Sequence, residues 1–287
     1  MIPERFRYHR ARSLDEALDL VAQAPGQARI LAGGHSLIPL MKLRLAQPQW
    51  VIDVEEVAEL RGIREEGEVL HIGAMTRYRE LMTDPLVARD APLLALAARR
   101  VGDLQVRNRG TVGGALCHAD PAADLPAAAL ASDAELELRS RRGQRRVALG
   151  DFLQGPLTTD LKPDEVLVAI HVPRRPGWGV AYQKFPHPAS GYAVVGVAAA
   201  IAAESGRVAR VCLGVTGVGP RAYRAAASEE RLVGTGLDPE VLRAASAVVT
   251  DGIAVNHDQF ASAEYRRHLA ATYAERALAA AWAAIQA

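Results

Sequence analysis

The sequence predicts an α+β protein that is built from two domains. Helical and strand-like segments are mixed along the chain, as judged from the spacing of the apolar residues. The length of 287 residues corresponds to about two domains of roughly 150 residues each. Residues 173–179, PRRPGWG, concentrate proline and glycine and therefore indicate a boundary. We expect a first domain over 1–176 and a smaller second domain over 177–287.

The first elements alternate between helix and strand. Ser13 and Glu16 have the spacing of a capping box and predict a helix that ends at Pro25–Gly26. A short strand is expected over 28–31, followed by the Gly33–Gly34 pair. A short helix over 36–45 and a compact apolar strand over 50–54 complete this part.

The middle of the chain adds further strands and helices. Apolar runs bounded by turn residues predict strands over 69–72, 134–139, 145–149 and 166–172. Helical spacing predicts helices over 76–82 and 92–101, and the alanine-rich segment 124–131 follows a predicted loop over 107–114. Together these elements complete an α+β domain.

The second domain is expected to hold a three-stranded sheet with helices. The predicted strands cover 180–185, 192–203 and 207–215, and the last two form a hairpin around Glu204-Ser205-Gly206. Helical segments are predicted over 223–232, 239–249 and 261–285.

Composition excludes several classes of partner and site. The 34 basic and 33 acidic residues give a net charge of +1, which argues against a nucleic-acid or anionic-membrane partner. Two cysteines are too few for a four-thiolate zinc site, an iron–sulfur cluster or a disulfide framework. We find no signal peptide and no apolar run long enough to span a bilayer, and we therefore expect a cytoplasmic protein.

Common catalytic signatures are also absent from the sequence. It contains no Walker loop, no GxGxxG fingerprint, no HExxH helix, no GxSxG elbow and no CxxC pair. Cys117 and His118 are adjacent, but two neighbouring side chains on a loop make a poor metal site without further ligands. We therefore predict no metal ligand and no catalytic acid, base or nucleophile.

Two similar glycine segments remain, Ala32-Gly33-Gly34-His35-Ser36 and Thr111-Val112-Gly113-Gly114-Ala115. Paired glycines allow positive φ and remove β-carbons, so that consecutive backbone N–H groups can converge on an anion. Ser36 and Thr111 add hydroxyl groups, and a helix that begins near Leu37 adds a favourable dipole. Each pair alone is more simply a tight turn. Two such segments in one domain predict two walls around a single pyrophosphate, as in a dinucleotide bound outside a Rossmann fold.

The joint pattern resembles the FAD-binding medium subunit of the molybdenum hydroxylase family, of the carbon monoxide dehydrogenase type. The resemblance covers nearly the whole chain. It rests on AGGHSLIPLMKLRLAQP with WVIDV (32–54), LHIGAMTRYREL (70–81), RNRGTVGGALCHADPAADLPAAALASDAELEL (107–138) and YQKFPHPASGYAVVGVAA (182–199). It implies a PCMH-type FAD-binding domain with subdomains of about 1–56 and 57–176, and a C-terminal domain typical of these flavoproteins.

The resemblance also implies which residues hold the FAD. The two glycine segments would bind its diphosphate largely through backbone amides, and Asp124 would bond the flavin or its ribityl chain. Lys184 and Tyr192 match residues near the isoalloxazine ring. Ala115 departs from the family, which usually has Asn or Asp there, so a side-chain contact is lost. The implied set is Ala32, Gly33, Gly34, His35, Ser36, Leu37, Thr111, Val112, Gly113, Gly114, Ala115, Asp124, Leu167, Lys184 and Tyr192.

Each of these side chains also has a purely structural interpretation. His35 could be a polar loop residue, and Asp124 could cap the helix that begins before Leu125–Pro126. Lys184 could be a solvated strand residue and Tyr192 part of a core. A cation near the flavin would instead stabilise its anionic reduced form.

The function that the resemblance implies is that of an oxidoreductase subunit. Non-covalent FAD would take electrons from [2Fe–2S] clusters on a small partner subunit and pass them to a quinone, NAD or oxygen. Molybdopterin would lie on a large partner subunit, in a dimer of heterotrimers that could touch the inner face of the membrane. Two other functions stay open: a self-contained flavin oxidoreductase of the same fold, and an assembly subunit that has lost its cofactor.

Overall fold

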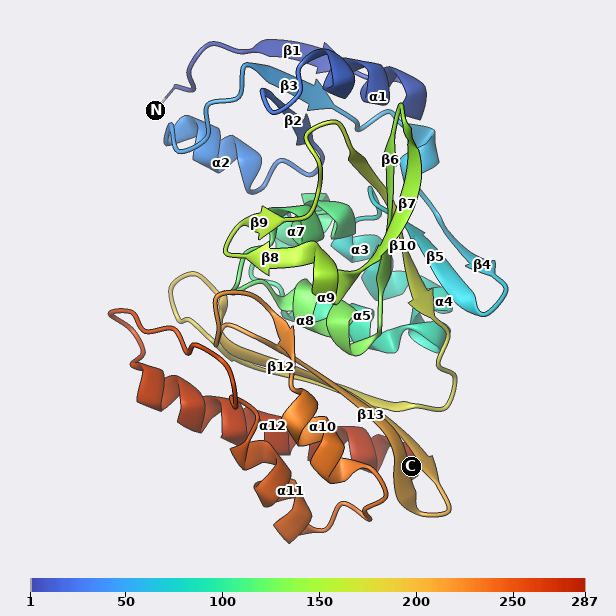
Figure 1. Ribbon diagram of the computed structural model, residues 1–287, viewed down its shortest axis with the longest axis vertical. Coiled ribbons are helices and arrows are strands. Elements are labelled where there is room, and N and C mark those ends of the chain that lie inside the picture. The colour runs from blue at the N-terminus through green and yellow to red at the C-terminus, as the bar shows by residue number, and fades with distance from the viewer. Residues whose placement is uncertain (1, 287) are drawn as a thin grey trace.

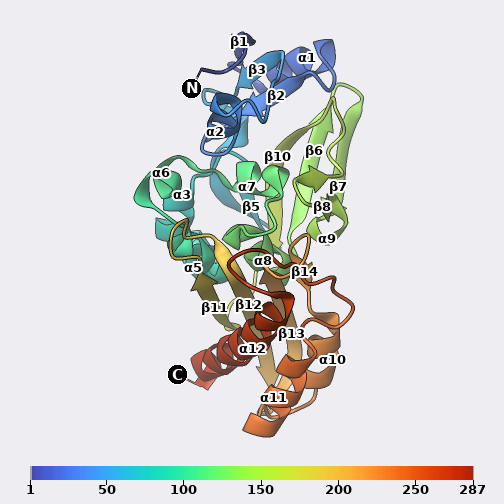
Figure 2. The same ribbon diagram turned by 90° about the vertical axis from the view of Figure 1, so that its left-hand side faces the viewer.

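Three sheets of three or more strands are stacked along the long axis of the molecule, and a two-stranded hairpin lies beside the middle one (Figure 1). The computed structural model describes residues 2–286. In the view turned by 90°, the N-terminal sheet lies at one end and the C-terminal sheet with its long helix at the other (Figure 2). The mixed α and β architecture agrees with the predicted class.

The N-terminal sheet has three parallel strands in the order β1-β3-β2. Ser13 caps the first helix by accepting a hydrogen bond from the backbone N–H of Glu16, as its sequence predicts. The first strand was not predicted, because its four residues are polar and largely exposed. The elements are β1 (Arg7–Arg10), α1 (Leu14–Gln23), β2 (Ala28–Leu31), α2 (Leu37–Lys42), β3 (Trp50–Asp53) and η1 (Ala58–Leu60).

The middle sheet has five antiparallel strands in the order β4-β5-β10-β6-β7. Its strands are β4 (Ile63–Glu66), β5 (Val69–Gly73), β6 (Glu135–Ser140), β7 (Gly143–Ala148) and β10 (Val166–Pro173), beside a hairpin of β8 (Leu153–Gly155) and β9 (Thr158–Thr159). The helices are α3 (Tyr78–Thr83), α4 (Pro85–Asp90), α5 (Pro92–Arg100), α6 (Leu104–Arg109), α7 (Val112–His118), α8 (Asp124–Ala131) and α9 (Leu149–Phe152).

The C-terminal sheet has four antiparallel strands, not the three that we predicted. Tyr223 and Arg224 form the additional strand, where the sequence indicates the start of a helix, because they pair with Val215 and Gly214. The elements are β11 (Gly179–Pro186), β12 (Ala193–Glu204), β13 (Arg207–Thr216), β14 (Tyr223–Arg224), α10 (Ala226–Leu232), α11 (Pro239–Ala247) and α12 (Ala263–Gln286).

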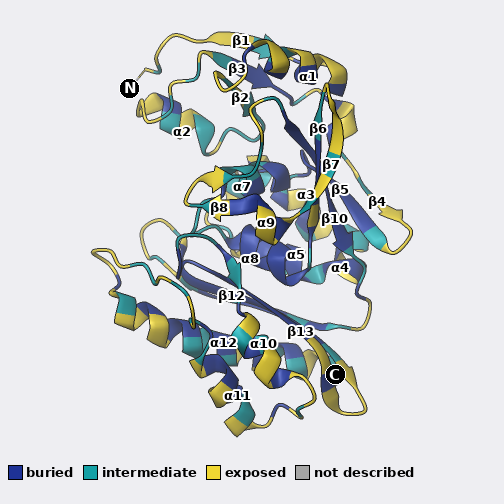
Figure 3. Cartoon of the chain, in the orientation of Figure 1, coloured by how far each residue is buried: buried dark blue, intermediate teal, exposed yellow. Residues whose placement is uncertain are grey.

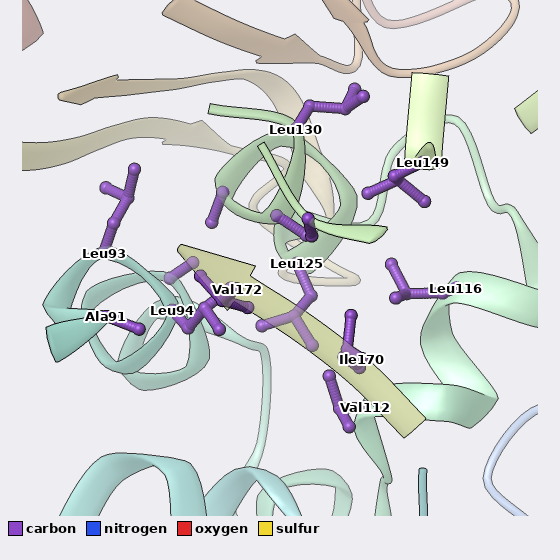
Figure 4. Packing of buried hydrophobic residues seen from close by; sticks show 14 of the residues in the cluster. Ala91, Leu93, Leu94, Val112, Leu116, Leu125, Leu130, Leu149, Ile170 and Val172 are labelled. Atoms are coloured by element: carbon purple, nitrogen blue, oxygen red, sulfur yellow. The ribbon is translucent and has the colours of Figure 1, made fainter. Parts of the chain in front are cut away.

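Helix α8 lies at the centre of the molecule, and all eight of its residues are buried. Leu125 of α8 belongs to the same apolar cluster as Ile170 of β10 and Val112 of α7 (Figure 4). The helix also packs against β12 and β13, and Gly214 allows this contact, since a β-carbon there would lie 2.0 Å from the carbonyl oxygen of Ala127.

Helix α12 covers the opposite face of the C-terminal sheet, against β11 and β12. Strand β12 is therefore buried on both faces over most of its length, whereas the outer sides of α11 and α12 are exposed (Figure 3). Among the described residues, no helix combines the length and apolar character that crossing a bilayer requires.

Candidate functional site

A cavity of about 740 Å³ lies where the N-terminal sheet meets the helices of the middle part. Its walls come from segments that are far apart in the sequence. It is lined by all of the predicted site residues except Val112 and Lys184: Ala32, Gly33, Gly34, His35, Ser36, Leu37, Thr111, Gly113, Gly114, Ala115, Asp124, Leu167 and Tyr192. The fold thus gathers the residues that the sequence singled out.

The first glycine segment connects β2 to α2. Gly34 has a φ of +76°, which favours glycine, and Gly33 lies directly on the backbone of Arg109 and Gly110, just before the second segment. Within residues 2–286, the backbone N–H groups of residues 33–37 donate to no protein acceptor. The side chain of Ser36 makes no capping hydrogen bond to α2. This segment therefore presents a run of free donors at the cavity.

The second glycine segment is helical, which corrects the loop that we predicted over 107–114. Gly113 and Gly114 lie in the first turn of α7, and Thr111 is its N-cap. The N–H of Gly113 donates to the carbonyl of Ala74 at 2.9 Å, and that of Gly114 to Oγ1 of Thr111 at 3.2 Å. These amides are already used within the protein, as is that of Ala115, which donates to the carbonyl of Thr111 at 3.0 Å.

The glycines of the second segment serve close packing instead. A β-carbon on Gly113 would lie 2.7 Å from the β-carbon of Ala74. Val112 is fully buried in the core beneath the cavity. The two segments thus differ: the first has the free N–H groups, whereas the amides of Gly113, Gly114 and Ala115 already donate within the protein. That both segments bind the diphosphate stays a prediction.

Asp124 lies at the bottom of the cavity and is only 5% exposed. Its carboxylate accepts hydrogen bonds from Tyr182 Oη at 2.6 Å and from Lys184 Nζ at 2.7 Å. Burial raises the pKa of the Asp124 carboxyl, and the adjacent ammonium of Lys184 opposes that rise. Asp124 is the first residue of α8, and the N-cap is Ala123, so the predicted capping role is wrong.

Lys184 does not line the cavity, because it lies behind Asp124. It is 3% exposed and also donates to the carbonyl of Arg100 at 2.9 Å. Lys184 is therefore neither solvent-exposed nor part of the cavity wall. Sequence reasoning missed Tyr182, although the alternation of side chains along β11 places residues 182 and 184 on the same face.

Aromatic side chains complete the cavity. Tyr192 is 45% exposed, so it is not a core residue. Tyr78 was not predicted, although it lies within a motif that carries the resemblance, and burial raises its pKa. Cys117 and His118 also line the cavity, without a carboxylate or further histidine that completes a metal site in the part of the chain described.

Comparisons with known proteins cover the whole length of the chain. Residues 4–175 match the model of the FAD binding domain in molybdopterin dehydrogenase, and residues 180–281 match the CO dehydrogenase flavoprotein C-terminal domain. The carbon monoxide dehydrogenase medium chain of Hydrogenophaga pseudoflava is 40% identical over 99% of both chains. A putative xanthine dehydrogenase FAD-binding subunit of Escherichia coli is 34% identical over 96% of both.

Solved structures give the same result. A chain of carbon monoxide dehydrogenase from Hydrogenophaga pseudoflava superposes with a TM-score of 0.96 at 42% identity and 99% coverage of both chains. A chain of quinoline 2-oxidoreductase from Pseudomonas putida gives a TM-score of 0.93 at 34% identity, covering 99% of this chain and all of the other. The chain therefore belongs to the FAD-binding medium subunits of the molybdenum hydroxylases and is an oxidoreductase component.

Proposed function

We propose that this subunit binds FAD non-covalently in the cavity, takes electrons from [2Fe–2S] clusters of a small partner subunit and passes them to an external acceptor. The observation that carries the proposal is the run of free backbone N–H groups of residues 33–37 at the cavity wall, held against the backbone of Arg109 and Gly110. Because N–H groups that face a cavity favour anions, a diphosphate suits this wall.

The residues present fit an FAD group. The volume of about 740 Å³ lies within the range of roughly 300–1,000 Å³ that is usual for cofactor and ligand sites. The cavity wall is largely apolar around Leu37, Leu125 and Leu167, as an aromatic ring system requires. Polar groups of the wall include the glycine segments and Asp124, together with further side chains such as Asp120, Thr159 and Lys162.

Bound FAD supplies reversible redox chemistry to the subunit. Residues 33–37 would hold the diphosphate, with Thr111 and Gly114 of the second segment lining the same cavity, and the backbone of Arg109 and Gly110 would keep the first segment in place. Lys184 and Tyr182 hold the Asp124 carboxylate in one orientation, so that it can accept a hydrogen bond from the cofactor. The protein thus binds and orients, and its own side chains provide no redox group.

The partners that we propose are a large molybdopterin subunit and a small [2Fe–2S] subunit, in a dimer of heterotrimers. The chain contains two cysteines, Cys117 and Cys212, and Cys212 is buried against Arg175 and Asp133. Electrons must therefore come from another chain. Quinone, NAD and oxygen are the candidate acceptors, and the proposed location is the cytoplasm, with the complex able to touch the inner face of the membrane.

The division into domains of 1–176 and 177–287 also stays a proposal, with subdomains of about 1–56 and 57–176. The match to the first family model ends at residue 175 and the match to the second begins at residue 180, which supports the boundary. Limited proteolysis of the full chain would test it: a first cut within 174–178 supports the division, and resistance there argues against it.

Reconstitution tests the function directly. The purified full chain is incubated with FAD, desalted and examined by visible spectroscopy, then mixed anaerobically with a reduced [2Fe–2S] partner subunit. We expect one FAD per chain and bleaching of its absorbance only after the partner is added. Absence of bound FAD would indicate an assembly subunit, and bleaching by small organic substrates without a partner would indicate a self-contained flavin oxidoreductase.

A further inference from the structure

The middle sheet carries a second cluster of polar side chains, on the face that points away from the apolar core. In β5, Leu70 and Ile72 belong to the core, so the intervening His71 points to the other face. Register then aligns three neighbours on that face: Arg64 of β4 lies opposite His71, and His71 lies opposite His171 of β10. Glu66 of β4 and Glu137 of β6 lie on the same face, next to this row.

The two histidines are buried without the hydrogen bonds that a buried ring needs. His71 is 4% exposed and His171 is 2% exposed. Among the described residues, both ring nitrogens of His71 and Nδ1 of His171 have no hydrogen-bond partner. Each buried nitrogen without a partner reduces the stability of the fold by about 1–3 kcal/mol, which indicates that a ligand is missing.

The Nδ1 atoms of both histidines lie near the carboxylate of Glu66. Their distances from it are too long for a hydrogen bond but closer to the spacing of two ligands on one metal ion. Nδ1 of His71 lies 3.6 Å from Oε1 of Glu66, and Nδ1 of His171 lies 3.9 Å from Oε2. Both distances exceed the roughly 3.2 Å limit of a good hydrogen bond. Ligand atoms around a tetrahedral zinc ion lie roughly 3.4 Å apart, because each is about 2.1 Å from the metal. The three side chains would therefore have to move closer together to complete the coordination of a zinc ion.

The surroundings of His171 match those of a metal-binding histidine. Its Nε2 hydrogen-bonds Oε2 of Glu137 at 2.9 Å, and its Nδ1 lies on the side of Glu66. A carboxylate that fixes the tautomer in this way is a usual support for metal-bound histidine.

We propose that Glu66, His71 and His171 form a binding site for a zinc-class divalent cation, with Glu137 as the support of His171. One carboxylate and two imidazoles are a ligand set that zinc accepts, with water in the fourth position. The three side chains offer ligand atoms that all lie within 4.8 Å of one another. The site stands on β4, β5 and β10, and none of its residues lines the cofactor cavity.

Arg64 competes with the cation for Glu66. Its guanidinium lies 2.6 Å from Oε1 of Glu66, and its side chain is 55% exposed, so it can swing into solvent when a metal binds. Glu137 is likewise paired with Arg139 through its other oxygen, Oε1, which leaves Oε2 for His171. Removal of Arg64 should therefore strengthen binding, which a merely structural ion pair does not predict.

The test titrates zinc into the full chain after treatment with a chelator, by calorimetry. We expect one zinc per chain in the wild type, at least about tenfold weaker binding for Glu66→Gln and His171→Gln, and a 10–100-fold loss for Glu137→Gln. Arg64→Gln should bind several-fold more tightly. His268→Gln, at an exposed histidine of α12, is the matched control and should bind as the wild type does.

Cobalt provides an independent, spectroscopic readout. A difference spectrum of the Co²⁺-loaded against the Zn²⁺-loaded chain should show ligand-field bands at longer wavelengths than oxidised flavin absorbs, and Glu66→Gln, whose carboxylate is partly exposed, should lose them. Absence of stoichiometric zinc binding in the wild type would overturn the proposal. Equal affinity of Glu66→Gln, Arg64→Gln and wild type would overturn it as well.

Discussion

Gly33 lies so close to the backbone of Arg109 that a β-carbon on residue 33 would come within 2.1 Å of the Arg109 carbonyl oxygen. This contact joins the first glycine segment to the end of α6, which is more than seventy residues away in the sequence and directly precedes the second segment. Real β-carbons do not approach oxygen atoms so closely. The absence of a side chain at residue 33 is therefore a condition for the wall of the cavity.

Gly33→Ala should push the first glycine segment away from α6 and α7 and should weaken FAD binding severely. Overpacking of this kind costs about 1–3 kcal/mol of stability, so most of the fold should survive. Gly236→Ala, at a glycine with no atom within 4 Å of its added β-carbon, is the matched control. Visible absorbance after desalting measures bound FAD. Full FAD content in Gly33→Ala would show that the contact is not needed.

Lys184→Met should destabilise the protein by about 3–5 kcal/mol, because it leaves the Asp124 carboxylate buried without its cation. The measurement is the free energy of unfolding from a urea titration. Adding Asp124→Asn to the same chain should restore a large part of the loss, since the buried charge is then removed. If the double variant is less stable than Lys184→Met alone, the ion pair is not the source of the effect.

Stability in acid should depend on Asp133, which accepts hydrogen bonds from Arg175 and Arg224. Burial acts to raise its pKa, but the two guanidinium groups outweigh it and hold the pKa below the usual value of 3.8. A carboxyl whose pKa is depressed by folding stabilises the native state above that usual value, and this stabilisation is lost as the pH falls through the depressed pKa.

Asp133→Asn should therefore reduce stability at neutral pH and flatten the loss of stability at acidic pH. Asp133 has a φ of +50°, and asparagine tolerates that conformation, so the backbone is preserved. Thermal unfolding between pH 7 and pH 2 measures the difference. A parallel pH profile in wild type and variant would exclude this carboxyl as the acid-labile group.

Ala115→Asn should strengthen FAD binding. Residue 115 lines the cavity in α7, and its methyl group makes no hydrogen bond. An asparagine there could donate to the cofactor, and one such bond contributes about 0.5–1.5 kcal/mol, or a few-fold to about tenfold in affinity. Fluorescence titration with FAD measures the affinity. Ala115→Val adds bulk without a donor and should not improve it.

Local sequence signals predicted the capped, amphipathic and compact elements well. Ser13 and Glu16 marked the start of α1, and continuous apolar runs marked β10 and β12. Strand β1 was not predicted, because it is defined by its pairing with β3 and its sequence, Arg7-Tyr8-His9-Arg10, carries no apolar pattern. Pairing partners that are distant in the sequence leave no trace in a local window.

The candidate site shows the same limit. Gly113 and Gly114 are poor helix formers, so their sequence predicted a loop. Close contact with Ala74 and the hydroxyl of Thr111 outweighs that propensity and places them in α7. Lys184 was expected beside the flavin, but the position of a strand residue in front of or behind Asp124 depends on how two domains meet, which no motif encodes.

The apolar cluster around α8 includes Tyr182, Ala198 and Cys212 from the C-terminal sheet. During synthesis, residues 70–172 therefore leave the ribosome before the strands that cover α8 exist. The alanine-rich side of that helix stays exposed until roughly forty further residues, up to Cys212 of β13, have been synthesised. A folding intermediate with this apolar surface exposed would be prone to aggregation. A chaperone that covers α8 until β13 has been synthesised would therefore raise the yield of native subunit.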